Sequence, residues 1–301
     1  MTKVLYLPLN YASVVQEGVY DAFREAGCNL QVFDYFTKYL NNRKRVKKVR
    51  DEFIREVKSF QPDLVYMQIQ HTKVINGATV KAARLVAPKA IFANWTGDVR
   101  SHAPPTFIDV GKASDFNFVS STGQLEMFEK QIGKPVRYLQ IGYNPKLYYP
   151  NFENQNFEWD CCFIANFNSK EKYPGTQERT QTCQLLRKRF GGKFILYGDG
   201  WPKRIGSKGS IDQKRLVDVY HKSKVLISVS HFNEINHYFS DRLLMCMASG
   251  RPVVQYHFPK YESYFSNNSD LVIANSPQDI VNKTQWLIDN PDMANFIGRS
   301  G

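Results

Sequence analysis

The chain has 301 residues, of which 43% are hydrophobic and 14% aromatic, so it can build two globular domains and is not intrinsically disordered. No apolar run is long enough to span a bilayer, and residues 1–3 lead straight into a strand instead of a signal peptide. The five cysteines are scattered and form no CxxC pair, which predicts a cytoplasmic protein with reduced thiols. The net charge of +12 points to a polyanionic partner, either nucleic acid or a membrane surface.

The N-terminal half alternates short apolar strands with amphipathic helices. Strands are predicted over 3–7, 30–33, 63–68, 89–93, 116–119 and 136–139, and helices over 13–26, over 43–58 and up to residue 131. This alternation predicts a parallel sheet with helices on both faces. The loop after the first strand has no GxGxxG pattern, so it is not a dinucleotide fingerprint.

Three of these strands end in polar or aromatic residues, at the edge where open α/β sheets bind ligands. The residues are Asn10 and Tyr11 after the first strand, Gln70 and His71 after the third, and Trp95, Asp98 and Arg100 after the fourth. Asp98, in NWTGDVR, is predicted to be buried and to take a proton from an attacking hydroxyl. Its alternative role is that of a turn residue that caps the next helix. A single strand-end histidine such as His71 is more often only a polar loop residue.

The helix predicted over 43–58 is strongly basic in its first half. Its apolar residues form a buried stripe, while its cations, among them Arg43, Lys44 and Lys47, crowd the first turns. A solvated helix face is the more frequent explanation of such a run. Cations near a helix start oppose the helix dipole, however, and so cost a little stability. This cost favours a functional reason for the cations, such as binding phosphate.

A Pro- and Asn-rich stretch at 144–157 marks a domain boundary, with predicted domains 1–145 and 146–301. The second domain repeats the alternation, with strands at 159–165, 194–197, 224–229, 253–256 and 271–274. Helices are predicted over 176–190, 216–222, 277–289 and 291–298. Polar residues again follow the strands, including Asn166 and Ser230.

The stretch 237–256, HYFSDRLLMCMASGRPVVQY, predicts a buried helix followed by a strand. Ser240 or Asp241 can cap the helix, whose first-turn N–H groups are then expected to be free. Arg242 at this helix start favours phosphate binding, because free N–H groups, the dipole and a guanidinium all attract anions. The alternative is an ordinary α/β unit in which Arg242 is merely solvated.

The order of several motifs resembles the CgeB-type, group 1-like nucleotide-sugar glycosyltransferases, a family in which a phage-type, DNA-modifying member is possible. The matching stretches are CCFIANFN, YGDGW, VYHKSKVLISVS and SDRLLMCMASGRPVV, with NWTGDVR and LQIGYNPKLYYP in the first half. The resemblance covers nearly the whole chain, although no single motif is highly specific. It implies the GT-B fold, an α/β architecture of two Rossmann-like domains whose parallel sheets face each other across a cleft. The donor would bind the C-terminal domain and the acceptor the N-terminal one.

The resemblance also implies roles for individual residues. Gly198, Asp199, Gly200 and Trp201 would face the base or ribose of the donor, and Ser240 and Arg242 its diphosphate. The whole predicted donor site consists of Asn166, Gly198, Asp199, Gly200, Trp201, Ser230, Ser240, Asp241 and Arg242. The chain departs from the family at Met245, where a glutamate often binds the donor ribose. Three alternatives follow: the ribose contacts come from other residues, the donor is an unusual one, or activity is lost.

The sequence thus predicts a metal-independent glycosyltransferase with no cofactor, a UDP-sugar as co-substrate, and Asp98 and Arg242 as catalytic residues. The expected acceptor is a hydroxymethylated pyrimidine in DNA, on which Tyr11 and Trp95 could stack, with Asn10, Gln70, His71, Arg100, Arg43, Lys44 and Lys47 around it. A cell-surface glycan or a lipid-linked sugar is the competing acceptor. The same scaffold could also serve a non-catalytic nucleotide- or nucleic-acid-binding protein, or an epimerase-like enzyme.

Overall fold

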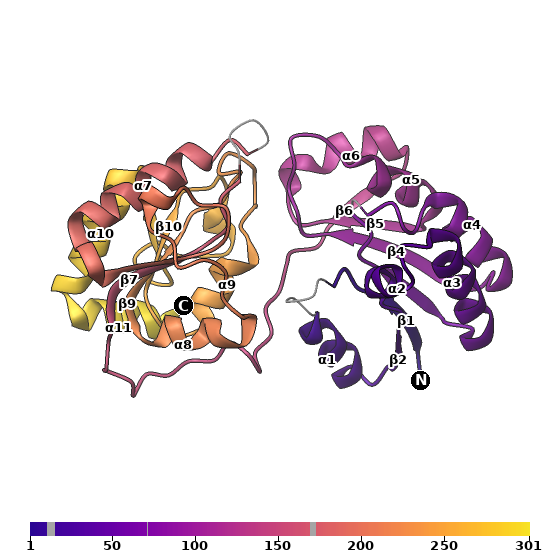
Figure 1. Cartoon of the computed structure of the whole chain (residues 1–301), viewed down its shortest axis with the longest axis horizontal. Coiled ribbons are helices and arrows are strands. Elements are labelled where there is room, and N and C mark those ends of the chain that lie inside the picture. The colour runs from indigo at the N-terminus through magenta and orange to yellow at the C-terminus, as the bar shows by residue number, and fades with distance from the viewer. Residues whose placement is uncertain (11–15, 71, 169–172) are drawn as a thin grey trace. The chain divides into compact units, whose positions relative to one another are not determined.

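The computed structural model describes residues 1–10, 16–70, 72–168 and 173–301. The chain divides into two compact units, Met1–Gln140 and Ile141–Gly301. Each unit is a parallel sheet covered by helices on both faces, as the sequence predicts (Figure 1). The predicted boundary at 145/146 places residues 141–145 in the first domain, whereas the structure groups them with the second.

The first unit contains six parallel strands in the order β2-β1-β3-β4-β5-β6. They are β1 (Lys3–Leu7), β2 (Asn29–Val32), β3 (Leu64–Met67), β4 (Ile91–Thr96), β5 (Phe116–Val119) and β6 (Val136–Tyr138). The helices are α1 (Glu17–Glu25), α2 (Tyr35–Asn41), α3 (Val46–Phe60), α4 (Gly77–Val86), α5 (Pro105–Ala113) and α6 (Leu125–Ile132).

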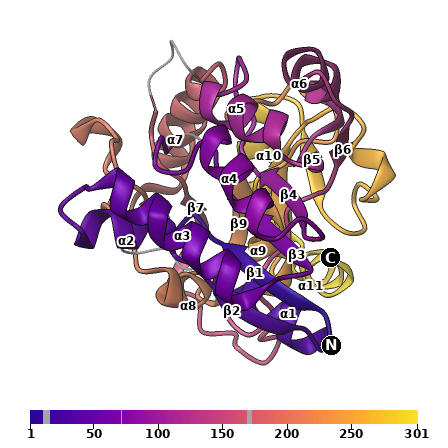
Figure 2. The ribbon, with the colours of Figure 1, turned by 90° about the vertical axis from the view of Figure 1, so that its right-hand side faces the viewer.

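Alternating residues of β1 separate the two faces of this sheet. Leu5 and Leu7 enter the main apolar core, to which α3 contributes Val49, Phe53 and Val57. Tyr6 points the other way and packs against Tyr20 and Phe23 of α1. In Figure 2, α3 lies between α2 and α4, both of which it contacts. The burial of one stripe of α3 leaves its basic side facing solvent.

The start of α3 differs from the prediction. The helix begins at Val46, not at residue 43, and Arg43 and Lys44 before it have positive φ angles of 51° and 59°. The left-handed backbone at these two residues breaks the helix that their side chains would otherwise extend. The helices α2, α4 and α5 were also not predicted, because each is short and lies between stronger strand patterns.

The second unit has five parallel strands in the order β11-β10-β9-β7-β8. They are β7 (Trp159–Ile164), β8 (Phe194–Tyr197), β9 (Ser223–Ser228), β10 (Val253–Tyr256) and β11 (Val272–Ala274). The helices are α7 (Thr176–Phe190), α8 (Leu216–His221), α9 (Asp241–Ala248), α10 (Pro277–Asp289) and α11 (Pro291–Ser300).

The strands of this unit alternate between two apolar cores. Cys161 and Phe163 belong to the core under α7, α10 and α11, while Cys162 belongs to the core under α8 and α9. Figure 1 shows α7 and α10 on one side of the sheet and α8 and α9 on the other. Both faces are therefore covered, as parallel sheets require.

The predicted linker packs onto the second unit. Arg251, which is 3% exposed, donates from one guanidinium nitrogen to the carbonyl oxygens of Asn151, Asn154 and His221. Tyr148 lies in the core beneath α8 and α9. Because buried carbonyls need donors, Arg251 satisfies three of them at once and holds the segment down.

Candidate functional site

The order of strands in the second unit defines where a ligand can bind. β7 and β9 are neighbours in the sheet. The chain continues from β7 to β8 on one side of this pair and from β9 to β10 on the other. In open α/β sheets, the crevice at the carboxyl ends of two such strands is the usual ligand site. The residues that follow these two strands, 165–175 and 229–240, therefore frame the candidate site, of which 169–172 lie outside the described residues.

Two arginines converge on this edge. Arg179 of α7 donates to the carbonyl oxygens of Val229 and Asn166 at 2.8 and 3.1 Å. Arg242 of α9 donates to the carbonyl of Ile164, to that of Val229 at 3.3 Å and to Ser240 Oγ at 3.2 Å. Both guanidiniums lie over the ring of Phe163, at 6.0 and 5.5 Å from its centroid. Backbone carbonyls at and just after the ends of β7 and β9 thus hold the two guanidiniums close to each other.

Neither arginine has a carboxylate partner among the residues that the structure describes. Arg179 is only 4% exposed. Burial, and next the charge of Arg242, lower the pKa of Arg179 well below its usual value. Buried charges in proteins are normally paired, so the buried Arg179 with the half-buried Arg242 beside it, and no acid, is a candidate anion site.

Unsatisfied polar atoms surround this pair. The hydroxyl of Ser230 and Nδ1 of His231 are buried, and neither has a hydrogen-bond partner in the described part of the chain. The backbone N–H of Ser230 is occupied, since it donates to Asn233 Oδ1 at 3.1 Å. Buried polar groups are nearly always paired, so these atoms mark a place where a polar ligand would complete the hydrogen bonding.

The predicted turn Gly198–Trp201 lies beside Asn166, which the sequence analysis assigned to the same site. Asn166 Oδ1 accepts from the N–H of Asp199 at 2.9 Å, and the Asp199 carbonyl accepts from Phe167 N at 2.8 Å. Gly198 and Gly200 have positive φ angles of 128° and 79°. Asp199 itself is exposed. Its carboxylate is therefore free to meet a hydroxyl group of a ligand.

Trp201 has a structural contact that the sequence did not indicate. Its indole N–H donates to the Ala165 carbonyl at 2.6 Å, and its ring packs against Phe167 with centroids 5.3 Å apart. The tryptophan therefore joins the ends of β7 and β8. Its only hydrogen-bond donor is already used.

The start of α9 differs in one respect from the expectation of free N–H groups. Ser240 precedes the helix but makes no capping hydrogen bond with its side chain. Asp241 Oδ1 instead accepts from the N–H of Arg242 at 2.8 Å. One of the amides expected to bind phosphate is thus occupied by an acid, and the guanidinium of Arg242 is the stronger candidate. Met245 is partly buried in the core under α8 and α9.

In the first unit, the switch in strand order lies between β1 and β3, and Asn10 and Gln70 of the predicted acceptor site follow these two strands. Tyr11 and His71 lie outside the described residues. Asn10 is 5% exposed; its amide donates to Tyr20 Oη and Asp34 Oδ2, both at 2.8 Å, and accepts from Gln16 N. This amide is fully engaged inside the unit. Gln70 is 7% exposed, and its Oε1 accepts no hydrogen bond from any described residue, so this oxygen can still accept one from a ligand.

Two expectations at the end of β4 need correction. Asp98 is not buried: its side chain is 54% exposed and pairs with Arg100, with Oδ2 2.8 Å from a guanidinium nitrogen. Trp95 is a strand residue that is 8% exposed, and its indole N–H donates to the Leu139 carbonyl at 2.9 Å. Trp95 is therefore a packing residue between β4 and the end of β6, not a stacking surface.

The start of α3 lies toward the ligand-binding edge of the first sheet. The helix ends at Phe60, whose carbonyl accepts a hydrogen bond from Nζ of Lys3, the first residue of β1. Farther back along the helix, Arg50 donates to the Val74 carbonyl beyond β3, at 2.7 Å. The helix thus runs against the strands, and the exposed cations at its start form what we call the α3 basic cluster: Arg43, Lys44, Arg45, Lys47 and Lys48.

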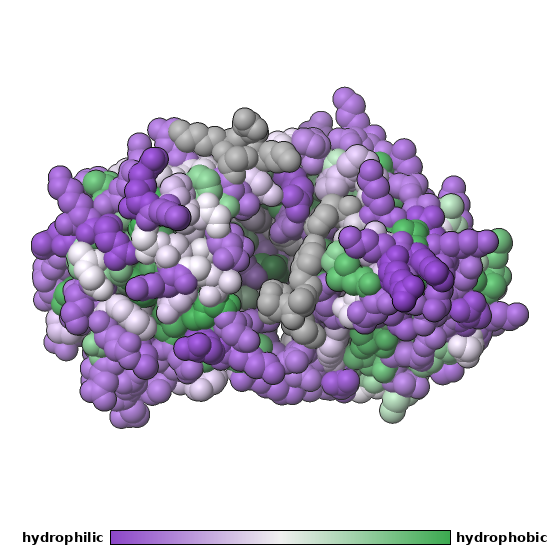
Figure 3. All heavy atoms as spheres, viewed as in Figure 1, coloured by the Kyte–Doolittle hydropathy of each residue, from purple (hydrophilic) through white to green (hydrophobic). Residues whose placement is uncertain are grey.

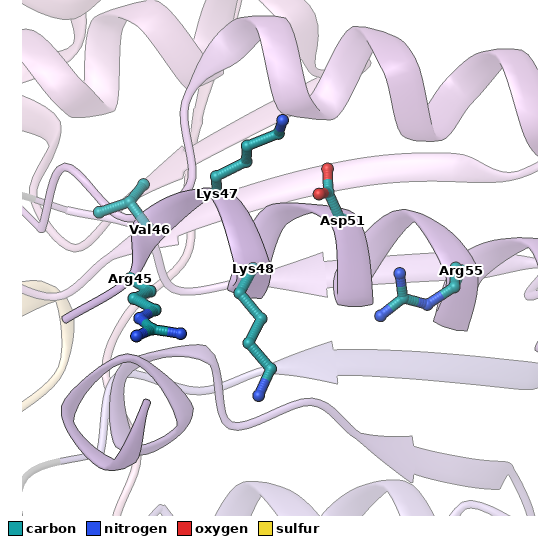
Figure 4. A pocket seen from close by; sticks show the side chains of 6 residues that line it. All are labelled: Arg45, Val46, Lys47, Lys48, Asp51 and Arg55. Atoms are coloured by element: carbon teal, nitrogen blue, oxygen red, sulfur yellow. The ribbon is translucent and has the colours of Figure 1, made fainter. Parts of the chain in front are cut away.

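An open pocket of about 570 Å³ lies on this helix, lined by Arg45, Val46, Lys47, Lys48, Asp51 and Arg55. In Figure 4, Arg45, Lys48 and Arg55 extend on one side of α3, while Lys47 and Asp51 point to the other. The most hydrophilic surface of this unit in Figure 3 gathers where Figure 1 places α2 and α3. Within the described ranges, no member of the α3 basic cluster takes part in an ion pair.

Two kinds of feature are absent from the part of the chain that the structure describes. No group of three or more His, Cys, Asp or Glu side chains there could hold a metal ion. No helix among the described residues is long and apolar enough to cross a membrane.

The sequence analysis missed Arg179 and His231. A signal for Arg179 was present, because it shares the buried stripe of α7 with Thr182, Cys183 and Leu186 at helical spacing. An arginine on the apolar stripe of a helix needs a buried partner. No comparable local signal existed for His231, which lies in an irregular loop.

Comparisons with known proteins support a glycosyltransferase fold. Residues 179–301 match the family described as "Glycosyl transferase-like". No curated protein sequence matches the chain. Among solved structures, the Anabaena protein Alr3699/HepE in complex with UDP and glucose aligns over 100% of this chain and 93% of its own, with 12% identity and a TM-score of 0.68.

Two other solved structures show the same likeness. The sucrose-phosphate synthase of Thermosynechococcus elongatus aligns over 100% of this chain and 93% of its own, with 12% identity and a TM-score of 0.63. The glycosyltransferase of Rickettsia africae aligns over 99% and 91%, with 14% identity and the same TM-score of 0.63. The CgeB-type subgroup stays a prediction. The family match over 179–301 covers less than half of the chain, and the likeness to these structures shows that the chain has the GT-B fold.

Proposed function

We propose that this chain transfers a sugar from a nucleoside-diphosphate sugar, and that Arg179 and Arg242 bind the diphosphate. The observation that carries the proposal is the pair of guanidiniums at the ends of β7 and β9, which have no acid partner among the described residues. A diphosphate supplies the missing negative charge and accepts several hydrogen bonds from two arginines. UDP is the proposed nucleotide, since the Anabaena protein of the same fold was solved with UDP and with UDP-glucose.

Asp199 and Ser230 extend this donor site. The exposed carboxylate of Asp199 is placed beside Asn166 and could accept from a ribose hydroxyl. The buried hydroxyl of Ser230, which has no partner, could donate to a phosphate oxygen. In related enzymes a glutamate makes the ribose contact, and Met245 stands at its position in this chain. Asp199 supplies that contact instead.

The proposed reaction forms a bond from an acceptor oxygen to the anomeric carbon and breaks the bond from that carbon to the diphosphate. The diphosphate leaves with the electron pair, and the two guanidiniums stabilise its added negative charge. The proton of the acceptor hydroxyl passes to the carboxylate of Asp98, which is exposed enough to be reached. If the reaction retains configuration, Asp98 instead anchors the acceptor hydroxyl, and the hydroxyl proton passes to an oxygen of the departing diphosphate.

We further propose that the reaction needs no metal ion. The support is the positive charge of Arg179 and Arg242, which can meet the leaving diphosphate directly. Transfer that continues at full rate in excess EDTA is the expected result. Activity lost in EDTA and restored by Mg²⁺ or Mn²⁺ would contradict it.

For the acceptor we propose DNA that carries hydroxymethylated pyrimidines. The support is the net charge of +12 and the α3 basic cluster, whose five cations are exposed and lie toward the ligand-binding edge of the first unit. A phosphate backbone is attracted by such a charge, and a base must leave its stack to reach Asp98. With Trp95 buried, Tyr11 remains the aromatic side chain proposed to stack on that base.

The donor site can be tested by titration calorimetry with UDP. Arg179→Met and Arg242→Met should each weaken UDP binding about 10- to 100-fold, because each removes charge-assisted hydrogen bonds. Lys188→Met is the matched control, since it removes a positive charge from an exposed position on the same helix as Arg179. If both arginine variants bind UDP as the wild type does, the proposal is wrong.

The acceptor is tested by incubating the enzyme and a UDP-sugar with hydroxymethylated DNA, plain DNA and a lipid-linked acceptor. Transfer only to modified DNA, falling steeply with salt, would support the proposal. Transfer to the lipid acceptor alone would favour the glycan alternative. Absence of DNA binding even at about 50 mM salt would exclude DNA, since phosphate attraction is strong there. Binding of UDP with neither hydrolysis nor transfer would favour a non-catalytic protein.

A further inference from the structure

The two ring nitrogens of His231 have different partners. Nε2 lies 2.6 Å from a terminal nitrogen of Arg179 and 3.0 Å from Asn168 Nδ2. A guanidinium can only donate hydrogen bonds, so Nε2 must be the acceptor of the Arg179 contact. The proton of a neutral imidazole then lies on Nδ1. Arg179 thereby fixes the tautomer of His231, and His231 in turn fixes one end of the Arg179 guanidinium.

The surroundings of His231 favour the neutral ring. Burial, followed by the charges of Arg179 and Arg242, lowers the pKa of His231 to about 3, although the Asn166 backbone favours the charged form. The ring also lies against Tyr173, with centroids 4.7 Å apart. At neutral pH the imidazole therefore carries no charge and offers one N–H donor, at Nδ1.

Within residues 1–10, 16–70, 72–168 and 173–301, this single donor meets no acceptor in hydrogen-bonding geometry. His231 is 9% exposed, and its buried Nδ1 has no hydrogen-bond partner among the residues that the structure describes. A buried N–H group without an acceptor costs about 1 to 3 kcal/mol. The neighbouring residue, Ser230, likewise buries an unpartnered hydroxyl, and both residues follow β9 at the switch point of the sheet.

We propose that His231 binds the donor diphosphate through Nδ1–H while its Nε2 positions the Arg179 guanidinium. The inference rests on the proposed function, because the acceptor of the Nδ1–H bond is an oxygen of the nucleotide's diphosphate. A neutral imidazole adds a hydrogen bond without a third positive charge beside the buried guanidinium of Arg179 and the half-buried one of Arg242. It thus orients the diphosphate while Arg179 and Arg242 supply the charge.

Two substitutions separate the two nitrogens. His231→Gln can place an amide oxygen near the position of Nε2 and keep the Arg179 contact, but it removes the donor at Nδ1. His231→Asn keeps an amide N–H near the position of Nδ1 and removes the Arg179 contact. Titration calorimetry with UDP should show about tenfold weaker binding for each variant, because each loses a hydrogen bond to or through a charged group.

Uridine is the matched probe, since it has the base and ribose of UDP but no phosphate. Its affinity, measured by competition, should be the same in wild type and in both variants. A purely structural role of His231 would lower uridine and UDP binding together and would overturn the inference. Unchanged UDP affinity in His231→Gln would overturn it as well, while failure of the wild type to bind UDP would instead reject the proposed function.

A measurement on the wild-type protein avoids any dependence on how the variants fold. Nitrogen NMR of protein labelled at histidine should find Nδ1 of His231 protonated and Nε2 unprotonated at neutral pH. Addition of UDP should shift Nδ1 and protect its hydrogen from exchange with solvent. The opposite tautomer, or an Nδ1 signal that UDP does not change, would contradict the proposal.

Discussion

A Cβ atom on Gly198 would lie 2.0 Å from the carbonyl oxygen of Ala165. The two residues follow β8 and β7, adjacent strands whose ends support the candidate donor site. The φ angle of Gly198, +128°, is one that residues with a side chain rarely adopt. Both the close approach and the backbone angle therefore require glycine at this position.

The first prediction concerns this contact. Gly198→Ala should destabilise the protein by about 2 to 4 kcal/mol, from the steric overlap and the strained backbone together. It should also weaken UDP binding, because the turn carries Asp199. Gly192→Ala is the control, since nothing lies within 4 Å of a Cβ there. Denaturant unfolding measures the difference, and equal stability of the two variants would contradict the prediction.

The second prediction concerns the anchor of residues 141–157. Arg251→Met should destabilise the second unit by about 2 to 4 kcal/mol, because the carbonyls of Asn151 and Asn154 lose this donor and that of His221 keeps only Asn154 Nδ2. Limited proteolysis should then cut within 141–157 faster than in the wild type. Lys203→Met, at an exposed position of the same unit, should leave the cleavage rate unchanged. Equal cleavage of wild type and Arg251→Met would show that this segment is held by other contacts.

The third prediction concerns Asp98. Asp98→Asn keeps the shape of the side chain and removes its basic oxygen, so turnover should fall about 10²-fold or more. UDP affinity should stay the same, because Asp98 belongs to the other unit. Asp292→Asn, which changes an exposed acid of α11, serves as the control for the loss of one negative charge. Near-normal turnover of Asp98→Asn would exclude both the base and the anchoring role.

The fourth prediction is a loss of stability in acid through His231. Its pKa is lowered from 6.5 to about 3 in the folded protein, so the unfolded chain takes up this proton first as the pH falls. The stabilising contribution of the neutral ring is complete above pH 6.5 and is lost progressively between 6.5 and 3. The melting temperature of the wild type should therefore fall more steeply over this range than that of His231→Gln. Parallel melting curves for the two proteins would contradict the assignment.

The sequence by itself determined the elements and their class. The helix predicted over 176–190 and the strands predicted over 3–7, 116–119, 194–197 and 253–256 agree with the structure residue for residue. These segments carry strong local signals, namely apolar periodicity and glycine or proline at their ends, which act between residues close in sequence. The same signals predicted which strand ends carry polar groups, including Asn166 beside the turn at Gly198.

Only the tertiary structure decided which of these residues meet and which are buried. Arg179, His231 and Arg242 come from a helix, a loop and a second helix, and no local pattern relates them. Trp95 and Asp98 are three residues apart in the chain, yet their environments differ. Trp95 is buried against the Leu139 carbonyl, whereas about half of the Asp98 side chain is exposed. Burial and charge pairing depend on contacts between distant segments, which the order of strands creates and short-range periodicity does not encode.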